Sequence, residues 1–413
     1  MGDKMKVCVM NQGLEGAIPF YRLYQPLKYC ERKGLLNVVF HDPNTSSKDI
    51  IDEIEDSDII IWQCPTSLNV WKWLCAVKNE NEKEHRNRKV IIEFDDSLVD
   101  ISPWNEKYRV FGSKETFVDI TEKEKENFDR LNDLVSKGNK EIWQIPGGNW
   151  QYKLWQDGED GFHIEDNVHR MEAALAIVQG CDLFQCTTKE LAKLWHKHSE
   201  RTGKTAILPN LIDFNRWLPQ KPNDTEQIRI VWQGGSSHYR DWQPVLPALK
   251  KLEKEYGDRI QLVVAGQTWK GIHGKLKNVE EHGWHGDIRT YPLMMRELKA
   301  DIGIIPLEDT TFNRGKSSLK WLEYSALEIP TIASDVSPYK EVIDYGKTGY
   351  LVKNTTDDWY EHIKSLIDNP QIGREMALKA KNRVKKKWGI DRSVEWHEAY
   401  ESLNAYSTVK ERA

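Results

Sequence analysis

The stretch that decides the fold covers residues 228–238 and reads IRIVWQGGSSH. Its first part, Ile228–Trp232, is short, apolar and rich in β-branched residues, which predicts a buried strand. Glycines and serines follow at once, a composition typical of a tight turn. Ligands of open α/β sheets bind at the loops that follow the carboxyl ends of parallel strands. The candidate substrate-binding residues of this turn are therefore Gly234, Gly235, Ser236 and His238.

Short apolar segments of the same kind recur along the chain, and amphipathic stretches separate them. In the first half the predicted strands are Lys6–Met10, Val38–Phe40, Asp58–Trp62, Lys89–Phe94, Asp182–Cys186 and Ala206–Leu208. In the second half they are Ile228–Trp232, Gln261–Ala265, Asp301–Pro306, Thr331–Ala333 and Tyr350–Val352. The clearest helical patterns are Pro244–Tyr256, Ser318–Leu327 and Trp359–Ile367. Strands that are apolar throughout need helices on both faces, so this alternation predicts a doubly wound α/β architecture.

The series of strands and helices runs twice, which predicts two Rossmann-like domains facing across a cleft. The seam is the segment Leu208–Asp213, LPNLID, and a polar stretch separates it from the second series. A length of 413 residues suits two or three domains of ordinary size. We expect domains at residues 1–212 and 213–390. Within residues 391–413 we expect an aromatic, amphipathic helix that packs back across both domains.

The composition excludes several classes of protein. Lys and Arg total 59 and Asp and Glu total 64, and the net charge of −5 argues against coating nucleic acid by bulk charge, although a local basic groove stays compatible. The mean hydropathy is −0.67, and the absence of a run of about eighteen apolar residues predicts no transmembrane helix. The first strand begins at once, which leaves no room for a signal peptide. The six cysteines show no CxxC spacing, so we expect a reducing, cytoplasmic location.

The first strand ends in another glycine turn, residues 11–17, NQGLEGA, and a helix opens soon after it. Glycines at such a turn let backbone N–H groups approach a phosphate or a sugar, and a helix N-terminus favours an anion. Gly13, Gly16 and Arg22 are therefore candidate substrate-binding residues. The GxGxxG dinucleotide fingerprint is absent, and an ordinary turn between a strand and a helix is the alternative.

The densest group of polar residues lies at 312–324, FNRGKSSLKWLEY. Ser317 or Ser318 is suited to cap a helix, whose N-terminus carries partial positive charge. Basic side chains just ahead of it complete a predicted anion site, in which Lys316 is a catalytic candidate. Glu323 lies about one and a half turns into the helix, where a carboxylate can accept hydrogen bonds from a ribose diol. A basic helix start with a solvated glutamate is the alternative.

Three further residues are catalytic candidates. Asp95 and Asp96 end the strand Lys89–Phe94, where carboxylates suit metal binding, general-base catalysis or a solubilising turn cap. With no third ligand in view, the sequence does not support a metal site. Arg240 lies beyond the second glycine turn and, like His238, can contact a phosphate. For His238 alone, an ordinary histidine in a surface loop is the alternative.

Residues 103–166 interrupt the alternation. They contain a charged helix candidate, Thr121–Lys137, and then an aromatic stretch with Trp143, Trp150 and Trp155. The chain holds 17 tryptophans, and several of them gather in this insertion. Flat aromatic faces can stack on sugar rings or on bases, so these three tryptophans are candidate acceptor-binding residues. Aromatic anchors that pin a long loop to the body are the alternative.

Together these pieces resemble a GT-B glycosyltransferase of the broad class that contains the retaining family 4 enzymes. The second half carries most of the resemblance, through His238, Asp241, Gly283–Gly286, Tyr291–Lys299, Ala300–Leu307, Lys316–Ser317, Glu323–Tyr324, Ile329–Ser334 and Gly346–Val352. The linker Leu208–Asp213 and the opening helix with Tyr21, Arg22 and Pro26 are also similar to parts of such enzymes. The order and spacing of these motifs make the resemblance specific, and it is weakest over residues 103–166.

The resemblance implies a nucleotide diphosphate sugar bound mainly by the second domain, with no cofactor and no metal. Glu323 matches the second glutamate of the family's Glu-x7-Glu motif and would contact the ribose, while Lys316 and Ser317 would contact the diphosphate. Such enzymes stabilise the leaving diphosphate with fixed cations and a helix N-terminus. Two departures stand out. Gly315 takes the place of the first glutamate, and Arg240 is only a rough substitute for the Arg and Lys that usually follow the glycine turn.

The expected function is transfer of a sugar to an acceptor hydroxyl, where the acceptor is a glycan, a lipid-linked sugar, a protein or a modified nucleobase. An inverting reaction needs a general base, for which Asp95 or Asp96 is the first candidate, whereas a retaining reaction needs no protein nucleophile. The basic pattern Arg374–Lys387 leaves peripheral contact with a membrane open, although a solvated helix face is commoner. The alternatives are a non-catalytic sugar-nucleotide or glycan-binding protein on the same scaffold, which Gly315 keeps open, and a GT-B sugar-nucleotide epimerase.

Overall fold

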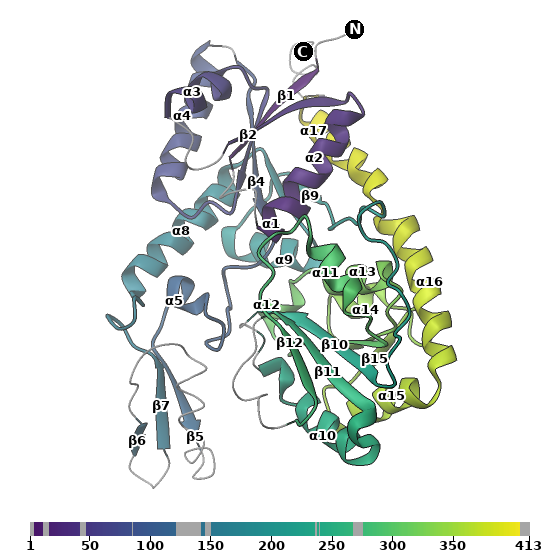
Figure 1. Cartoon of the computed structure of the whole chain (residues 1–413). Coiled ribbons are helices and arrows are strands. Elements are labelled where there is room, and N and C mark those ends of the chain that lie inside the picture. The colour runs from purple at the N-terminus through teal and green to yellow at the C-terminus, as the bar shows by residue number, and fades with distance from the viewer. Residues whose placement is uncertain are drawn as a thin grey trace.

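Two six-stranded sheets flanked by helices make up most of the molecule. The computed structural model describes residues 4–10, 16–41, 47–84, 86–120, 142–144, 150–235, 238, 240–266 and 276–404. Figure 1 shows the sheet of the first half above the sheet of the second, with a smaller three-stranded sheet hanging from the first half. The predicted doubly wound α/β architecture is confirmed.

The first sheet has the strand order β2-β1-β3-β4-β8-β9, and all its neighbouring strands are parallel. Its strands are β1 (Met5–Met10), β2 (Leu36–His41), β3 (Ile59–Gln63), β4 (Lys89–Phe94), β8 (Leu183–Cys186) and β9 (Thr205–Ile207). Each predicted strand of the first half forms, with ends that move by at most two residues. The chain reverses its direction of travel across the sheet between β1 and β3, which makes a switch point where such sheets bind ligands.

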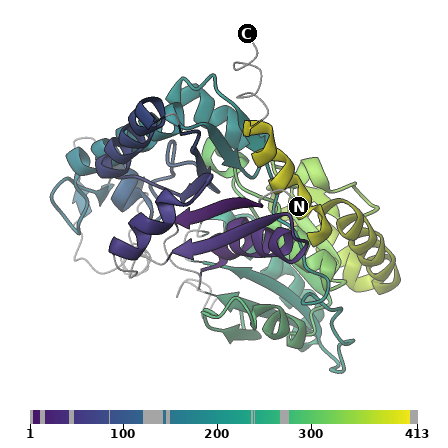
Figure 2. The same cartoon turned by 90° about the horizontal axis from the view of Figure 1, so that it is seen from above.

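Helices cover both faces of the first sheet, and Figure 2 shows them on either side of the purple strands. They are α1 (Ala17–Pro19), a π-helical turn (Phe20–Tyr24), α2 (Gln25–Arg32), α3 (Ser47–Glu55), α4 (Leu68–Glu84), α5 (Tyr108–Phe111), α8 (Ile164–Gly180) and α9 (Lys189–Ser199). One face of the sheet buries Val9 against Leu27 and the C-terminal helix, and the other buries Ile92 against Ile177 and Trp195. The strands therefore need no polar face, as their sequences predict.

The second sheet has the order β12-β11-β10-β13-β14-β15 and is also parallel. Its strands are β10 (Ile228–Gly234), β11 (Ile260–Gly266), β12 (Val279–His282), β13 (Ile302–Ile305), β14 (Thr331–Ser334) and β15 (Tyr350–Val352). The sequence patterns miss β12, VEEH, because an edge strand can be polar and still pair on one side. The switch point of this sheet lies between β10 and β13, next to the glycine turn.

The helices of the second half pack on both faces of the second sheet. They are a 3₁₀ turn (Arg240–Trp242), α10 (Val245–Tyr256), a 3₁₀ turn (Gly257–Arg259), α11 (Tyr291–Glu297), α12 (Thr311–Arg314), α13 (Leu319–Ala326), α14 (Tyr339–Val342), α15 (Thr356–Asp368) and α16 (Pro370–Trp388). Trp232 and Trp359 are buried on one face, and Trp321 and Tyr324 on the other. Part of the tryptophan excess therefore fills this core.

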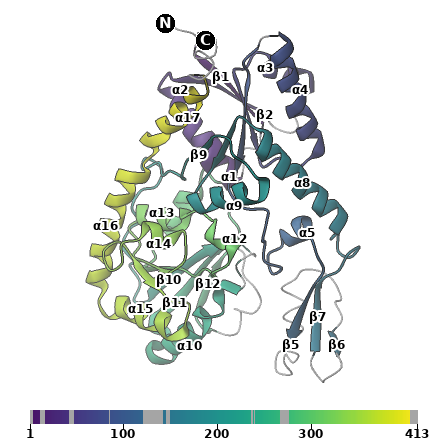
Figure 3. The same cartoon turned by 180° about the vertical axis from the view of Figure 1, so that it is seen from behind.

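Two chain segments cross between the halves, and they lie side by side. The N–H of Ile212 donates to the carbonyl of Trp388 (2.8 Å), and the N–H of Ile390 donates to the carbonyl of Ile212 (2.9 Å). After a 3₁₀ turn (Ile390–Ser393), α17 (Val394–Asn404) packs on the first sheet. Figures 1 and 3 show α16 and α17 as a yellow column along one side of both halves. The predicted returning helix is confirmed, and the predicted domain limits stay predictions.

The insertion contains a three-stranded antiparallel sheet with the order β5-β7-β6. Its strands are β5 (Thr116–Ile120), β6 (Ile142–Gln144) and β7 (Trp150–Trp155). The sequence analysis does not predict these strands, because polar residues interrupt the apolar ones in β7, which therefore lacks the pattern of a fully buried strand. The helix candidate Thr121–Lys137 lies outside the described residues. Within the described ranges, no helix is long and apolar enough to span a membrane.

The returning helix α17 gives a stability prediction. Trp396 is fully buried against the first sheet, and its Nε1–H donates to the carbonyl of Arg22 (3.3 Å). Trp396→Ala removes this packing and should lower the free energy of unfolding by about 3–5 kcal/mol. Leu378→Ala on α16, where the side chain is half exposed, is the matched control and should change it by less than about 0.5 kcal/mol. Urea unfolding followed by far-UV circular dichroism measures both, and equal effects would contradict the packing of α17.

Candidate active site

A cavity of about 380 Å³ lies between the two sheets, at the carboxyl ends of their strands. Gly16, which precedes α1, and Asp95 and Asp96, which follow β4, line it from the first half. Gly234 at the end of β10 and Leu307 after β13 line it from the second half. Both switch points thus open onto one space, whose volume falls within the range of small-molecule sites.

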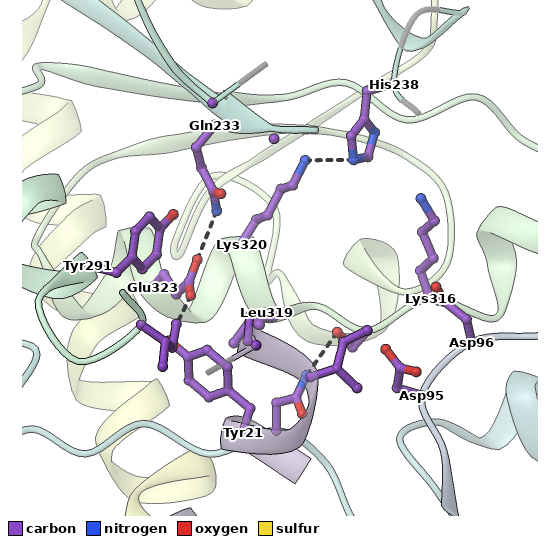
Figure 4. A pocket seen from close by; sticks show the side chains of 18 of the residues that line it. Tyr21, Asp95, Asp96, Gln233, His238, Tyr291, Lys316, Leu319, Lys320 and Glu323 are labelled. Atoms are coloured by element: carbon purple, nitrogen blue, oxygen red, sulfur yellow. Dashed lines mark hydrogen bonds between the residues drawn. The ribbon is translucent and has the colours of Figure 1, made fainter. Parts of the chain in front are cut away.

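Glu323 on α13 is a buried carboxyl at one end of the cavity. Its Oε1 accepts a hydrogen bond from the Tyr21 hydroxyl (2.8 Å), and its Oε2 accepts one from Gln233 Nε2 (2.8 Å). Burial raises the pKa of Glu323 to about 7, because these hydrogen bonds and a nearby lysine offset only part of the desolvation. Figure 4 shows the group with Tyr291 beside it. Since Tyr21 comes from the first half, this hydrogen bond joins the two halves.

Lys320 and His238 occupy the middle of the cavity. Lys320 Nζ lies 3.2 Å from His238 Nε2, and His238 Nδ1 lies 2.6 Å from Asp241 Oδ2. Burial and the Lys316 charge lower the pKa of Lys320 to about 7, and burial beside both lysines lowers the pKa of His238 to about 3. His238 is therefore neutral, with its proton on Nδ1 facing the Asp241 carboxylate and its Nε2 facing the lysine.

Lys316 adds a second ammonium group to the cavity. It lies four residues before Lys320, in the turn that precedes α13. Figure 4 shows Lys320 between Glu323 and the aspartates, and Lys316 on the same side as Asp95 and Asp96. Two cations in one cavity form a strong attraction for a polyanion.

Asp95 and Asp96 differ in environment although they are adjacent. Asp96 Oδ2 accepts a hydrogen bond from Lys107 Nζ (2.8 Å). Burial would raise the pKa of Asp96, but the charges of Lys107 and Lys316 hold it below its usual range. Burial and then the Asp96 charge raise the pKa of Asp95 to about 7. Asp96 is thus a fixed carboxylate, and Asp95 is the carboxyl that can exchange a proton near neutral pH.

Arg22 borders the cavity, and two of its three guanidinium nitrogens are bonded to protein partners. It is buried, with its Nε donating to Glu93 Oε1 (2.6 Å) and its Nη1 to the carbonyl of Leu208 (2.6 Å) and to Asn210 Oδ1 (3.2 Å). Gln63 Nε2 donates to the other oxygen of Glu93 (3.0 Å). These bonds hold the Arg22 side chain at the edge of the cavity, while its buried Nη2 has no hydrogen-bond partner in the described structure, so the predicted substrate contact stays a prediction.

Gly315 packs against α9 of the first half. A β-carbon at this position would lie 3.2 Å from Leu194 Cδ1 and 3.5 Å from Leu191 Cδ1. The carbonyl of Gly315 also accepts a hydrogen bond from the Thr188 hydroxyl (3.1 Å). A side chain at this position would have to push the Leu194 methyl group aside by a few tenths of an ångström, so the close packing against α9 favours glycine over the first glutamate of the motif.

The start of α13 differs in part from the predicted helix cap. The Ser317 hydroxyl accepts a hydrogen bond from Asn210 Nδ2 (3.0 Å), another link between the halves. Ser318 holds the N-cap position, but its side chain makes no capping hydrogen bond, so the predicted side-chain cap is wrong. Its backbone has φ −83° and ψ 19°, not the extended conformation that aims a serine hydroxyl at the helix. Ser318 is not among the residues that line the cavity.

The remaining candidates of the glycine turns fall into four groups. Gly16 and Gly234 line the cavity, and a β-carbon at 234 would lie 3.0 Å from Lys320 Nζ, so the glycine makes room for the lysine. Arg240 lies outside the cavity, where its Nε is 3.0 Å from Glu308 Oε1. Gly235 lies against Trp284. Gly13 and Ser236 lie outside the described residues.

The three tryptophans of the insertion do not form one exposed platform among the described side chains. Trp155 is 5% exposed, and its Nε1–H donates to the carbonyl of Pro103 (2.6 Å). It packs in a cluster with Tyr108, Phe162 and Phe312 of the second half, which fits the alternative of an anchor. The side chains of Trp143 and Trp150 lie outside the described part of the structure.

The sequence patterns do not indicate several residues of the cavity, among them Lys320, Gln233 and Trp284. Lys320 lies four residues after Lys316, but Lys316 precedes α13, so no helical repeat relates the two lysines. Gln233 directly precedes the glycine turn, and its local pattern is that of an ordinary strand residue. Trp284 follows β12, and it lines the cavity while 64% exposed. No group of three or more His, Cys, Asp and Glu side chains in the described ranges is arranged to hold a metal ion.

Comparison with known proteins finds similarity over both halves. Residues 213–387 match the model of the family Glycosyl transferases group 1. HepE from Anabaena, solved with UDP and glucose, is 12% identical with a TM-score of 0.58 over 97% of this chain and 100% of that chain. Sucrose-phosphate synthase from Thermosynechococcus elongatus is 13% identical with a TM-score of 0.58 over 98% and 100%. A glycosyltransferase from Rickettsia africae is 12% identical with a TM-score of 0.55 over the whole of both chains. No curated protein sequence matches the chain.

The adjacent carboxylates give a prediction that needs no substrate. In Asp96→Asn the neighbouring negative charge is lost and Lys107 is left facing Asp95, so the pKa of Asp95 should fall by about one pH unit or more. Asp100→Asn, at an exposed position of the same loop, is the control and should leave it unchanged. Carboxyl-carbon NMR titration measures the value. An unchanged pKa of Asp95 in Asp96→Asn would show that the two groups do not interact.

Proposed function

We propose, on the premise that this chain is a glycosyltransferase of the GT-B fold, that it moves a sugar from a nucleotide diphosphate sugar to an acceptor hydroxyl in the cavity. The observation that carries the proposal is the order of groups along the cavity. The Glu323 carboxyl stands at one end, Lys320 in the middle, and Lys316 with Asp95 and Asp96 at the other end. A nucleoside, a diphosphate and a sugar follow one another in the same order in the donor.

The nucleoside would occupy the end at Glu323. Its ribose diol would donate hydrogen bonds to the carboxylate that Tyr21 and Gln233 otherwise satisfy. The base would reach the loop after β12, where Trp284 offers an exposed ring beside Gly235. Aromatic faces stack on bases of any kind, so this contact supports a nucleotide without selecting its base.

The diphosphate would lie against Lys316 and Lys320. Negative charge grows on it as the bond from the sugar's anomeric carbon to the diphosphate oxygen breaks, and fixed cations stabilise such charge without reorganisation. We therefore propose that transfer needs no metal ion. Arg240 is not required for this role, because Lys320 supplies the second charge inside the cavity.

Asp95 would accept the hydrogen of the acceptor hydroxyl as that oxygen bonds to the anomeric carbon. In an inverting reaction Asp95 keeps the proton as the general base, and in a retaining reaction the leaving diphosphate takes it while Asp95 orients the hydroxyl. The ion pair between Asp96 and Lys107 fixes the neighbouring carboxylate and keeps the loop in place. The pKa of Asp95 near 7 suits either role at neutral pH.

The overall test is turnover of nucleotide sugars by the purified protein. Release of nucleotide diphosphate, by slow hydrolysis or faster transfer, is the expected result with at least one donor, and a chelator should not change its rate. Product without any acceptor in which the nucleotide stays attached would indicate an epimerase. Tight binding of nucleotide sugars with no turnover across donors and acceptors would favour the non-catalytic scaffold instead.

Binding of nucleotide diphosphates tests the two donor contacts separately. Lys316→Ala should weaken binding about 10- to 100-fold, since it removes a charge-assisted hydrogen bond. Glu323→Ala should weaken a nucleotide with an intact ribose but not inorganic diphosphate. Lys347→Ala, at an exposed position far from the cavity, is the control. Isothermal titration measures all three variants, and normal nucleotide affinity of Lys316→Ala would sink the diphosphate assignment.

The pH dependence of kcat/KM should be bell-shaped with a maximum near pH 7. Asp95 and Glu323 act as carboxylates and have pKa values raised to about 7, so activity falls as the pH drops below this value. Lys320 acts as an ammonium and has a pKa lowered to about 7, so activity also falls as the pH rises above it. Lys320→Arg stays charged and should move the alkaline limb upward. An unmoved alkaline limb would show that Lys320 does not set it.

A further inference from the structure

A chain of hydrogen bonds leads from the backbone after β13 to the Lys320 ammonium group. The N–H of Glu308 donates to Asp241 Oδ1 (2.5 Å), and Asp241 Oδ2 lies 2.6 Å from His238 Nδ1. His238 Nε2 in turn lies 3.2 Å from Lys320 Nζ, a contact that Figure 4 marks. Asp241 and His238 are both buried. The position of a flexible lysine is thus tied to a backbone group through two buried side chains.

The protonation of this chain follows from its fixed end. The N–H of Glu308 can only donate, so Asp241 accepts there. Burial would raise the pKa of Asp241, but the His238 hydrogen bond and the Lys316 charge hold it below its usual range. The Asp241 carboxylate therefore keeps the His238 proton on Nδ1, and only a lone pair remains at Nε2. A phosphate oxygen is also an acceptor, so this nitrogen suits a lysine and not the diphosphate.

Two contacts restrict the Lys320 ammonium group. It lies within hydrogen-bond distance of His238 Nε2, and its Nζ lies 5.3 Å from the centre of the Trp232 ring. The rings of Trp232 and His238 meet edge to face, with their centres 5.9 Å apart. Gly234 leaves room for this arrangement, because a β-carbon there would lie 3.0 Å from both Lys320 Nζ and His238 Cδ2. An ammonium group has three N–H donors, so donors are left for the cavity that Lys320 lines.

We propose that Asp241 and His238 are positioning residues, which hold the Lys320 ammonium group in the orientation that binds the diphosphate. This inference rests on the proposed function and adds to it the two residues that act through Lys320. Lysine has a flexible four-carbon stem, and ordering such a side chain on a ligand weakens binding. A hydrogen bond that fixes Nζ beforehand removes part of that cost. The same hydrogen bond favours the charged form of Lys320, which is the form that attracts a diphosphate.

The charge of Asp241 has a second effect on the lysine. Burial and the Lys316 charge lower the pKa of Lys320, whereas the charges of Asp241 and Glu323 raise it. The titratable groups that face Lys320 and His238 are Lys316, Asp241, Glu323 and, from the first half, Asp96. Loss of the Asp241 charge would therefore lower the pKa of Lys320 further, besides releasing its histidine partner.

Asp241→Asn tests the direction of the chain. An asparagine has one acceptor oxygen, and the N–H of Glu308 needs it, so the NH₂ group is left facing the histidine. His238 can then move its proton from Nδ1 to Nε2, where it opposes the N–H groups of Lys320. We expect nitrogen-15 NMR of the imidazole, assigned by the signal lost in His238→Gln, to show the proton on Nδ1 in the wild type and on Nε2 in Asp241→Asn. A wild-type His238 with its proton on Nε2, or with both nitrogens protonated at pH 7, overturns the proposal.

Binding of inorganic diphosphate, measured by isothermal titration at pH 7, tests the effect on the lysine. His238→Leu removes the acceptor of Lys320 and should weaken binding about 10-fold. His238→Gln places an amide oxygen near the position of Nε2 and should stay within about 3-fold of the wild type. Both variants lose the hydrogen bond to Asp241, so their difference isolates the contact with the lysine. Asp241→Asn should weaken binding about 10-fold. Asp357→Asn, at an exposed position of α15, is its control and should leave binding unchanged.

A double variant separates positioning from a structural role. In a Lys320→Ala background, His238→Leu should weaken binding no further, since the histidine acts through the lysine. A further loss of about 10-fold in that background overturns the proposal, and so do equal losses in His238→Leu and His238→Gln.

Turnover of nucleotide sugars is measured separately and decides the proposed function. If the wild type binds inorganic diphosphate with the expected pattern but turns over no donor, the proposed function fails while the contacts of Lys320 stand as assigned. If it turns over a donor but all variants bind inorganic diphosphate equally well, the positioning role alone fails.

Discussion

The structure depends on a charge pair that is almost fully buried, Arg22 with Glu93. The arginine comes from the turn after β1 and the glutamate from the end of β4, and the same guanidinium holds the carbonyl of Leu208 and the side chain of Asn210. Asn210 in turn reaches Ser317 in the second half. Removing either charge would leave the other uncompensated, at a cost of about 3–5 kcal/mol. This charge pair therefore holds two parts of the cavity in place. One is the loop with the candidate catalytic carboxylates, and the other is the start of the lysine-bearing helix.

Near this charge pair, burial gives different pKa values to groups that are chemically alike. Asp95 and Asp96 share a turn, yet the one beside Lys107 stays ionised and the other holds its proton more tightly. Burial lowers the pKa of Lys320, and a diphosphate bound in the same cavity would raise this pKa again. The polar groups of the cavity are thus partly desolvated before any substrate enters. A bound donor would replace the present hydrogen bonds of these groups with its own.

The sequence predicted the fold well, because apolar strands and Gly-rich turns are local signals that the doubly wound arrangement uses directly. It also predicted Lys316 and Glu323 as residues of the cavity, since the start of one helix carries both. Tyr21 and Asn210 could not be assigned from patterns, because their contacts join positions about a hundred or more residues apart. The pairing of Arg22 with Glu93 could not be predicted for a related reason, since nothing near Arg22 in the sequence indicates Glu93. The strands of the insertion were missed because polar residues interrupt the apolar ones in β7.

The pair of crossing segments has a mechanical consequence. Ile212 and Gly389 lie side by side and are joined by backbone hydrogen bonds of their neighbours, so the two halves are connected by a narrow ribbon and not by two separate tethers. A ribbon of this kind bends far more easily than it twists or stretches. Relative motion of the halves is then close to rotation about one axis, and the displacement of any residue grows with its distance from that axis. Such a rotation would change the contacts of Phe312 with Tyr108 and Trp155 of the insertion.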